Sequence, residues 1–208
     1  MPFPPRILGR TGKAVPFLWH PLGDHAFGDA TWCAVEIGPD ALDRRADQIV
    51  IDRLASLGRK RCDILIAQDL TSSDIKVGWP THRLLQMRER GLCSYHAFEI
   101  DDALEAEWIA TNAPIHAIIA PYTRANMDIR FRTFEAAHNA GVAIVSRAES
   151  IDDLSIQHAT PQIAAIISSL QPPDDLAAVD VESLWQTYQQ THEAPPKLRS
   201  GHPPETGA

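Results

Sequence analysis

A short, continuously apolar run is the feature that most constrains how this chain can fold. Residues 64–67 read Ile-Leu-Ile-Ala, and a basic segment at 59–61 precedes them. Upstream, apolar residues recur at helical spacing until Gly58: Leu42, Ala46, Ile49, Val50, Leu54 and Leu57. A strand that is apolar on both faces is typical of a parallel sheet covered by helices. The segment therefore predicts one helix–strand unit of an α/β fold.

The same alternation repeats along the chain. Strands are predicted at 15–19, 32–37, 63–67, 93–98, 115–122 and 142–146. Helices are predicted between most of them, with Asp101 and Asp102 as caps of one helix and a polar loop at 71–80 before another. Residues 163–170 suit either a helix face or a short strand, and we favour the helix; a last helix is expected at 181–188. The pattern predicts a parallel sheet of six strands, either open or rolled into a barrel.

Length and composition predict one folded domain. The chain has 208 residues, of which 44% are hydrophobic, enough for one sizeable core. Its net charge of −8 argues against a nucleic-acid partner and against binding to an anionic membrane. Beyond residue 190 the sequence is rich in proline, glycine and charge. We expect a single domain at 1–190 and a disordered tail at 191–208.

The cysteines and the amino terminus predict a cytoplasmic protein. Cys33, Cys62 and Cys93 are isolated in apolar segments and no C-x-x-C pair exists, so we expect buried free thiols in a reducing compartment. The chain begins without a basic segment followed by an apolar run, and it contains no apolar stretch of 18 residues. These features predict neither export nor membrane insertion.

Four phrases in the correct order resemble the aldo/keto reductase family. Residues 6–15, RILGRTGKAV, resemble the family's opening hairpin, and residues 54–66 resemble its "SLkrLg-yiDlyli" segment. Residues 114–122, PIHAIIAPY, are similar to its "pvdvvQveY" strand, and residues 141–146 resemble the strand that follows. The resemblance implies a barrel of the (β/α)8 type and reduction of carbonyls with a nicotinamide cofactor. We therefore expect a reduced TIM-barrel-like fold with about six parallel strands.

The resemblance also locates the family's catalytic tetrad. Glu36 stands at the position of the family's lysine, and Gln68 stands at the position of its histidine. The segment with the family's aspartate and tyrosine would lie between Gly23 and Ala30, which is too short to hold it. By this comparison a helix, a strand and another helix are missing. Because the tyrosine proton donor is absent and a lysine is replaced by a carboxylate, we expect carbonyl reduction to be lost.

Polar residues at the strand ends are the candidate site residues, because such barrels carry their catalytic groups there. These ends form a polar and largely acidic rim: His20, Glu36, Gln68, Asp69, Glu99, Tyr122, Arg124, Arg147 and Glu149. We take Glu36, Gln68 and Asp69 as candidate catalytic residues. Tyr122 and Arg147 are the candidate contacts to NADP(H), the cofactor that the resemblance implies.

Two rim features each allow two interpretations. His20, Asp24 and His25, with Glu36 nearby, offer nitrogen and oxygen ligands for a divalent metal, or they form a polar loop that caps the barrel mouth. Glu36 is either a general base whose pKa is raised by apolar neighbours such as Trp32, or a solvated or salt-bridged carboxylate with Arg147 as a candidate partner.

Three functions stay open from the sequence. The chain is a binding or accessory protein that has lost reductase activity, an enzyme that uses the metal or carboxylate groups of the rim, or an NADP(H)-binding oxidoreductase. Its partner is a small molecule or a protein. Loss of two strand–helix units would leave an unpaired sheet edge, which soluble proteins usually cover. We therefore expect a homodimer or a hetero-complex that uses this seam.

Overall fold

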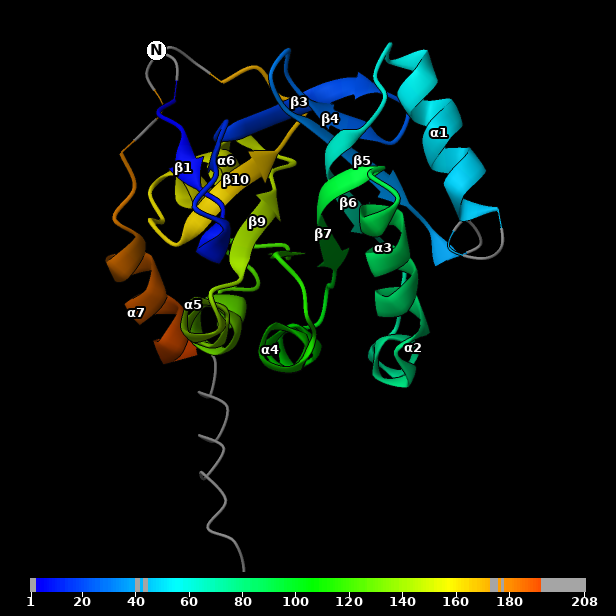
Figure 1. The fold of residues 1–208 in the computed structure, drawn as a ribbon. Helices are drawn as coiled ribbons and strands as arrows, with labels where there is room; N and C mark the ends of the chain where they lie inside the picture. The colour runs from blue at the N-terminus through cyan, green and yellow to red at the C-terminus, as the bar shows by residue number, and fades with distance from the viewer. Residues whose placement is uncertain (1–2, 40–41, 43–44, 173–175, 177, 192–208) are drawn as a thin grey trace, which may run out of the picture.

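Eight strands close into a barrel in the computed structural model, which describes residues 3–39, 42, 45–172, 176 and 178–191 (Figure 1). Around the barrel the order is β10-β3-β4-β5-β6-β7-β8-β9, and every neighbouring pair is parallel except those made by β4. The strands are β3 (Leu18–Gly23), β4 (Ala26–Gly28), β5 (Cys33–Ile37), β6 (Cys62–Ala67), β7 (Cys93–Glu99), β8 (Ala117–Ile119), β9 (Ala143–Arg147) and β10 (Ile163–Ile167).

Helices follow most of the parallel strands and pack outside the barrel (Figure 1). They are α1 (Ala46–Ser56), α2 (Ser72–Val77), α3 (Trp79–Glu89), α4 (Ala103–Asn112), the π-helix η3 (Arg130–Phe134), α5 (Glu135–Ala140), α6 (Ile151–His158) and α7 (Val181–Thr191). The polar loop expected at 71–80 was wrong, because Thr71 and Asp74 form a capping box that starts α2. Asp102 caps α4, as the sequence predicts.

A hairpin at the amino terminus closes one end of the barrel. It consists of β1 (Arg6–Ile7) and β2 (Ala14–Val15), joined through a 3-10 turn, η1 (Gly9–Thr11). Leu8 and Val15 pack against the apolar residues of the barrel interior. A Cβ at Gly9 would lie 2.5 Å from the backbone oxygen of Gly141, so only glycine allows this approach. The opening hairpin that the family resemblance implies is confirmed.

The expected number of six strands was too low, and β4 is the first strand that the sequence did not predict. β4 runs antiparallel to both β3 and β5, and a short turn joins it directly to β3. At three residues it is too short to show a periodic pattern. It lies between β3 and β5 and pairs with both, so the barrel closes and the expected open seam does not exist in the described structure.

β10 is the second additional strand; for residues 163–170 the helix was favoured over a short strand, and this preference was wrong. Residues Ile163–Ile167 instead pair in parallel with β9 and with β3. All five are buried, which is the environment of a parallel strand covered on both faces. A short apolar run does not distinguish such a strand from a buried helix by periodicity alone. The helix of this region is α6, which starts at a capping box of Ser150 and Asp153.

The three cysteines are buried free thiols, as the sequence predicts. They begin the neighbouring strands β5, β6 and β7, and Cys62 pairs in register with Cys93. No helix within the described ranges is long and apolar enough to cross a membrane. Residues 192–208, most of the predicted disordered tail, lie outside the described residues.

Candidate functional site

An ion-pair network crosses the mouth of the barrel, the end at which the parallel strands finish. Arg147, the last residue of β9, bonds through its guanidinium group to the carboxylates of Glu36 in β5 and Glu99 in β7. Its terminal nitrogen lies 2.9 Å from Oε2 of Glu99. The interior-facing residues Ala34 and Val145 stand two positions before Glu36 and Arg147. Because side chains alternate along a strand, Glu36 and Arg147 also face the interior.

Burial and charge act in opposite directions on Glu36. Its side chain is almost completely buried, at 5% exposure, and this burial raises the pKa of the carboxyl group. The charge and hydrogen bond of Arg147 oppose the rise. Burial lowers the pKa of Arg147, but the hydrogen bonds and charges of Glu99 and Glu36 outweigh this effect and raise it overall. The interpretation of Glu36 as a carboxylate paired with Arg147 is confirmed.

A cavity of about 530 Å³ opens at the mouth beside this network. It is lined by carboxylates, which are Glu36, Asp69, Glu99, Asp101, Asp102 and Glu105. Part of this acidity serves the fold, because Asp102 accepts hydrogen bonds from the backbone N–H groups of Leu104 and Glu105 at the start of α4. Acidic residues are favourable at such helix starts. Arg147 is the cation that lies among these carboxylates in the lining.

Two strained residues line the same cavity. His25 and Asp69 have φ angles of 55° and 57°, and they are the non-glycine residues with positive φ in the described part of the chain. The left-handed region is unfavourable for residues with a Cβ atom, and strained backbone concentrates at binding and catalytic sites. The backbone oxygen of His25 also accepts the N–H of Glu36, at 2.8 Å. The strain therefore lies beside the ion-pair network.

Gln68 and Asp69, the other candidate catalytic residues, also line the mouth cavity. The backbone N–H of Gln68 donates to the oxygen of Ile37, which fixes the end of β6 against β5. Glu36, Gln68 and Asp69, the three candidate catalytic residues, therefore all line the same cavity at the mouth.

The predicted metal ligands do not converge. His25 lines the mouth cavity, whereas His20 lines a different pocket beside Leu18 on the outside of β3. Asp24 is exposed in the turn between β3 and β4. Among the described residues, no group of three or more histidine, cysteine, aspartate or glutamate side chains has an arrangement that could hold a metal ion. His20 and Trp19 face opposite sides of β3, which explains why His20 leaves the mouth.

The two predicted cofactor contacts also separate. Arg147 is in the mouth, but Tyr122 is completely buried outside the barrel, where its ring packs 5.1 Å from that of Phe134. The two residues are linked only through their backbones. The side-chain nitrogen of Gln157 donates to the carbonyl oxygens of Tyr122, at 2.8 Å, and Arg147, at 2.7 Å. Tyr122 is therefore not available to contact a ligand in the mouth.

Sequence reasoning placed Glu99 on the rim but did not select it as a site residue. The observation that could have identified Glu99 is the interior position of Ala97, two residues earlier in the same strand. Phe27 was missed entirely, because it lies in the unpredicted strand β4; its ring centre is 5.4 Å from the guanidinium carbon of Arg147. Alternation along β7 could have identified Glu99, whereas Phe27 required the fold.

Comparison with known proteins gives a match in fold and none in sequence. No protein-family model matches the chain, and no curated protein matches it. The structure is similar to an aldo/keto reductase from Brucella melitensis, with a TM-score of 0.61 and 10% identity over 88% of this chain and 99% of that chain. It is also similar to the apo form of aldo-keto reductase AKR11C1 from Bacillus halodurans, with a TM-score of 0.58 and 13% identity over 92% and 91%.

The match to the holo form of the Bacillus halodurans protein has a TM-score of 0.55 and 12% identity, and it covers 78% of this chain. The matched part spans 66% of that protein, just under two thirds of its length. At these identities the comparisons establish the fold. The chain has the barrel fold of the aldo/keto reductases, as the sequence resemblance implies.

Proposed function

We propose that this chain is a relative of the aldo/keto reductases that does not reduce carbonyls and acts as a binding or accessory protein. The observation that carries the proposal is the ion pair of Glu36 and Arg147, which spans the mouth where barrels of this kind hold their substrates. The half-buried guanidinium group of Arg147 is fixed between the carboxylates of Glu36 and Glu99 and occupies space at this mouth.

The missing proton donor supports the same proposal. The family's reaction needs a tyrosine whose pKa is adjusted by lysine and histidine. The chain has three tyrosines, and none of them lines the mouth cavity. Tyr95 packs against Trp32 and His116, Tyr122 lies outside the barrel, and Tyr188 is on α7. Residues 18–37, from β3 to the end of β5, contain no tyrosine.

The mouth residues do not fit NADP(H). The cofactor is a polyanion, and the cavity lining presents carboxylates that would repel its phosphates. Arg147, the cation in this lining, is already paired with Glu36 and Glu99. Tyr122, the other predicted contact, is buried elsewhere. For the same electrostatic reason, the cavity favours a neutral or cationic small molecule over an anionic one.

A second candidate function is a carboxylate-dependent enzyme with Glu36 as general base. The observation in its favour is the raised pKa of this buried carboxyl group, which lies at a cavity beside the strained residues His25 and Asp69. The ion pair with Arg147 acts against it, because a carboxylate held by an arginine is a weaker base. The first candidate is therefore preferred.

Titration with NADPH tests the proposal. We expect no enhancement of NADPH fluorescence and no aldehyde-dependent loss of its absorbance, with an active aldo/keto reductase as positive control. A saturable fluorescence change would show that the chain binds NADPH and would overturn this part of the proposal. A thermal-shift panel of small amines and small carboxylates at equal ionic strength then tests the ligand class. Stabilisation by amines that disappears in Asp69→Asn supports it; stabilisation by carboxylates contradicts it.

We further propose that the chain works in the cytoplasm as a homodimer or in a hetero-complex. The three buried free thiols support a reducing compartment. The association cannot use an open sheet edge, because the barrel is closed. β3 and β4 are joined by a turn without a helix, and Leu22 near the end of β3 is an exposed apolar residue, so we place the contact with a partner at this hairpin. Light scattering on the purified chain tests the homodimer, and a monomer without partners in a pull-down would contradict both forms of association.

A further inference from the structure

Exposed apolar side chains gather on the adjoining helices α2 and α4. Among the described residues eight large apolar side chains are exposed, and four of them lie on α2, on α4 or at the first position of α3: Val77, Trp79, Leu104 and Trp108. Helices α2 and α4 are in contact, and Figure 1 shows them next to each other outside the barrel. Single exposed apolar residues are normal on a protein surface, whereas a group of them on adjoining elements indicates a contact for another molecule.

One face of α4 brings this apolar surface to the acidic mouth cavity. Leu104 and Trp108 are four residues apart, so they are neighbours on the helix surface, and Trp108 follows Glu105 by three residues. Glu105 lines the mouth cavity. Ala106 and Ile109, in contrast, are buried in the core beneath the helix. α4 therefore has an outer face on which exposed apolar side chains border a carboxylate of the cavity.

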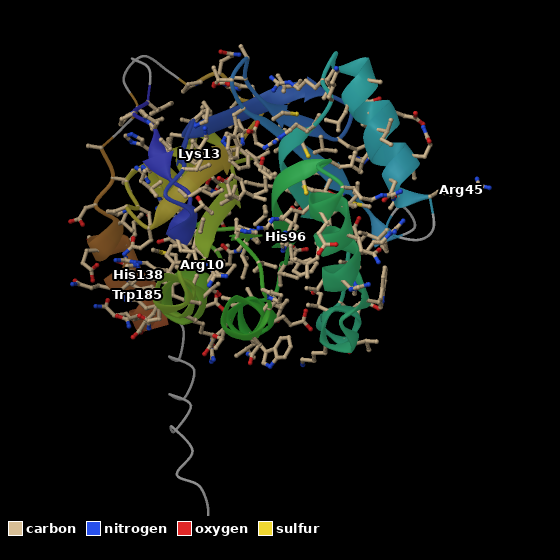
Figure 2. All side chains as sticks on the ribbon, viewed as in Figure 1. Arg10, Lys13, Arg45, His96, His138 and Trp185 are labelled. Atoms are coloured by element: carbon tan, nitrogen blue, oxygen red, sulfur yellow. The ribbon has the colours of Figure 1, made fainter. Side chains whose placement is uncertain are left out.

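Lys76 connects α2 to this face of α4. Its ammonium group lies 4.9 Å from the ring centre of Trp108, which is a cation–π distance. In the described part of the chain Lys76 forms no ion pair with a carboxylate. The cations Arg10, Lys13 and Arg45, labelled in Figure 2, belong to the amino-terminal hairpin and to the start of α1. An aromatic ring of the α4 face therefore already holds a cation, and Lys76 does not neutralise the carboxylates of the mouth.

Three carboxylates of the mouth cavity carry no ion pair among the described residues: Asp69, Asp101 and Glu105. Asp69 and Asp101 are exposed, and Glu105 is half-buried, so solvent reaches all three. The net charge of −8 adds a general attraction for cations. Negative charge and exposed apolar area thus lie side by side, and this combination is complementary to a surface that carries basic and apolar groups together.

We propose that this surface binds a basic, amphipathic segment of a partner protein, with lysine or arginine side chains in the mouth cavity and apolar side chains on Leu104 and Trp108. A small cation would use the carboxylates alone and would leave the apolar face of α4 uncovered. Tryptophan is enriched among the residues that dominate the energy of protein interfaces. The inference rests on the binding function proposed above and names the chemistry of the partner; the contact is additional to the one placed at the β3–β4 hairpin.

A random peptide library displayed on phage, selected on the purified chain at physiological ionic strength, tests the chemistry of the partner. We expect the selected peptides to combine lysine or arginine with leucine or aromatic residues. Acidic peptides, basic peptides without apolar residues, or no enrichment would each overturn the inference. If small amines still stabilise the chain in that case, the proposed binding function stands without it. Saturable binding of NADPH would instead count against the proposed function and leave the peptide result unchanged.

Two pairs of variants locate the binding surface, with a synthetic copy of the most enriched peptide as the probe. Leu104→Ser should weaken binding about tenfold, because an apolar contact is lost. Its control is Ile51→Ser on α1, where the side chain is 43% exposed, compared with 52% for Leu104. Glu105→Gln should also weaken binding about tenfold, because a charge-assisted hydrogen bond is lost. Its control is Glu135→Gln, since both glutamates lie in the first turn of a helix.

Both control variants should bind the peptide as the wild type does. Circular dichroism checks that all four variants are folded, which is expected because none of the four side chains is buried. Equal affinities in the test and control variants would place the peptide elsewhere and would overturn the proposed surface. A loss in Glu105→Gln without a loss in Leu104→Ser would overturn the contact with the apolar face of α4.

Discussion

Glu36 and Arg147 form an ion pair between two strands that lie opposite each other in the barrel. β5 is the fourth strand from β9 in either direction around the ring, through β10, β3 and β4 or through β8, β7 and β6. The pair thus connects opposite sides of the barrel at the mouth, and Glu99 on β7 forms a second ion pair with Arg147. Its removal should affect stability as well as access to the cavity.

Substitution of Arg147 by methionine is expected to destabilise the fold. The change leaves the Glu36 carboxylate buried without its cation, and this costs about 2–3 kcal/mol at neutral pH, less than for a fully buried pair because Arg147 is 27% exposed. Urea denaturation measures the difference. The control is Arg124→Met, which removes an exposed ion pair and should change stability by no more than about 0.5 kcal/mol.

The loss in Arg147→Met should depend on pH. Burial already raises the pKa of Glu36, and without the opposing charge the folded-state value rises further above the unfolded one. Between the two values the folded state holds more protons, so stability falls as pH rises through this window. The variant should therefore approach the wild type as pH is lowered toward about 4, the unfolded value. A deficit that grows on acidification would contradict this account.

Restoring two family residues should not restore activity. The double substitution Glu36→Lys and Gln68→His returns the lysine and histidine types, but no tyrosine of the chain lines the mouth. We expect no aldehyde-dependent oxidation of NADPH. A turnover of roughly 1 per second or faster would be in the range of ordinary enzymes and would show that the lost tyrosine is dispensable. An intact circular dichroism spectrum is needed to exclude loss by unfolding.

Gly28 should be essential for closing the barrel. It lies at the end of β4 with φ of 140°, and a Cβ there would be 2.0 Å from the backbone oxygen of Trp32. Gly28→Ala should therefore cost about 3 kcal/mol or more, or prevent folding. Gly12→Ala is the matched control, because Gly12 has φ of 67° and open space around it. Its cost should be about 1 kcal/mol, the conformational term alone. Equal losses would remove the steric explanation.

The thiols should be unreactive in the folded protein. Burial raises the pKa of Cys62 and raises that of Cys93 to about 12, so the nucleophilic thiolate is scarce as well as inaccessible. A thiol reagent should label none of the three cysteines until denaturant is added. Thr31→Cys, at an exposed position, reports reagent access. Native cysteines that react as fast as this reporter would contradict the buried arrangement.

Much of the barrel could be predicted from sequence, because the strands with clear helix–strand context follow local rules. The strand ending at Ala67 was predicted to within a residue, and the burial of its residues explains the apolar run. β4 and β10 could not be predicted for different reasons. β4 exists because β3 and β5 both need a hydrogen-bonding neighbour, and β10 has an apolar pattern shared by strands and helices.

The site was predictable where side-chain alternation applied. Glu36 and Arg147 face the interior by counting from the strand, and their pairing was one of the two interpretations of Glu36. Tyr122 and His20 were predicted to lie at the mouth, but both side chains point away from the barrel interior. Their direction depends on how the chain turns after a bend or before a hairpin. That orientation is decided by packing against elements distant in sequence, such as Phe134 for Tyr122.

The mouth of the barrel concentrates acidic side chains, because six carboxylates line one cavity there. The molecule therefore carries a local concentration of negative charge at the mouth in addition to its net charge of −8. Near a positively charged support it will turn its mouth toward the surface. Immobilised in this way, the protein would have a blocked mouth and a closed end that faces the solvent.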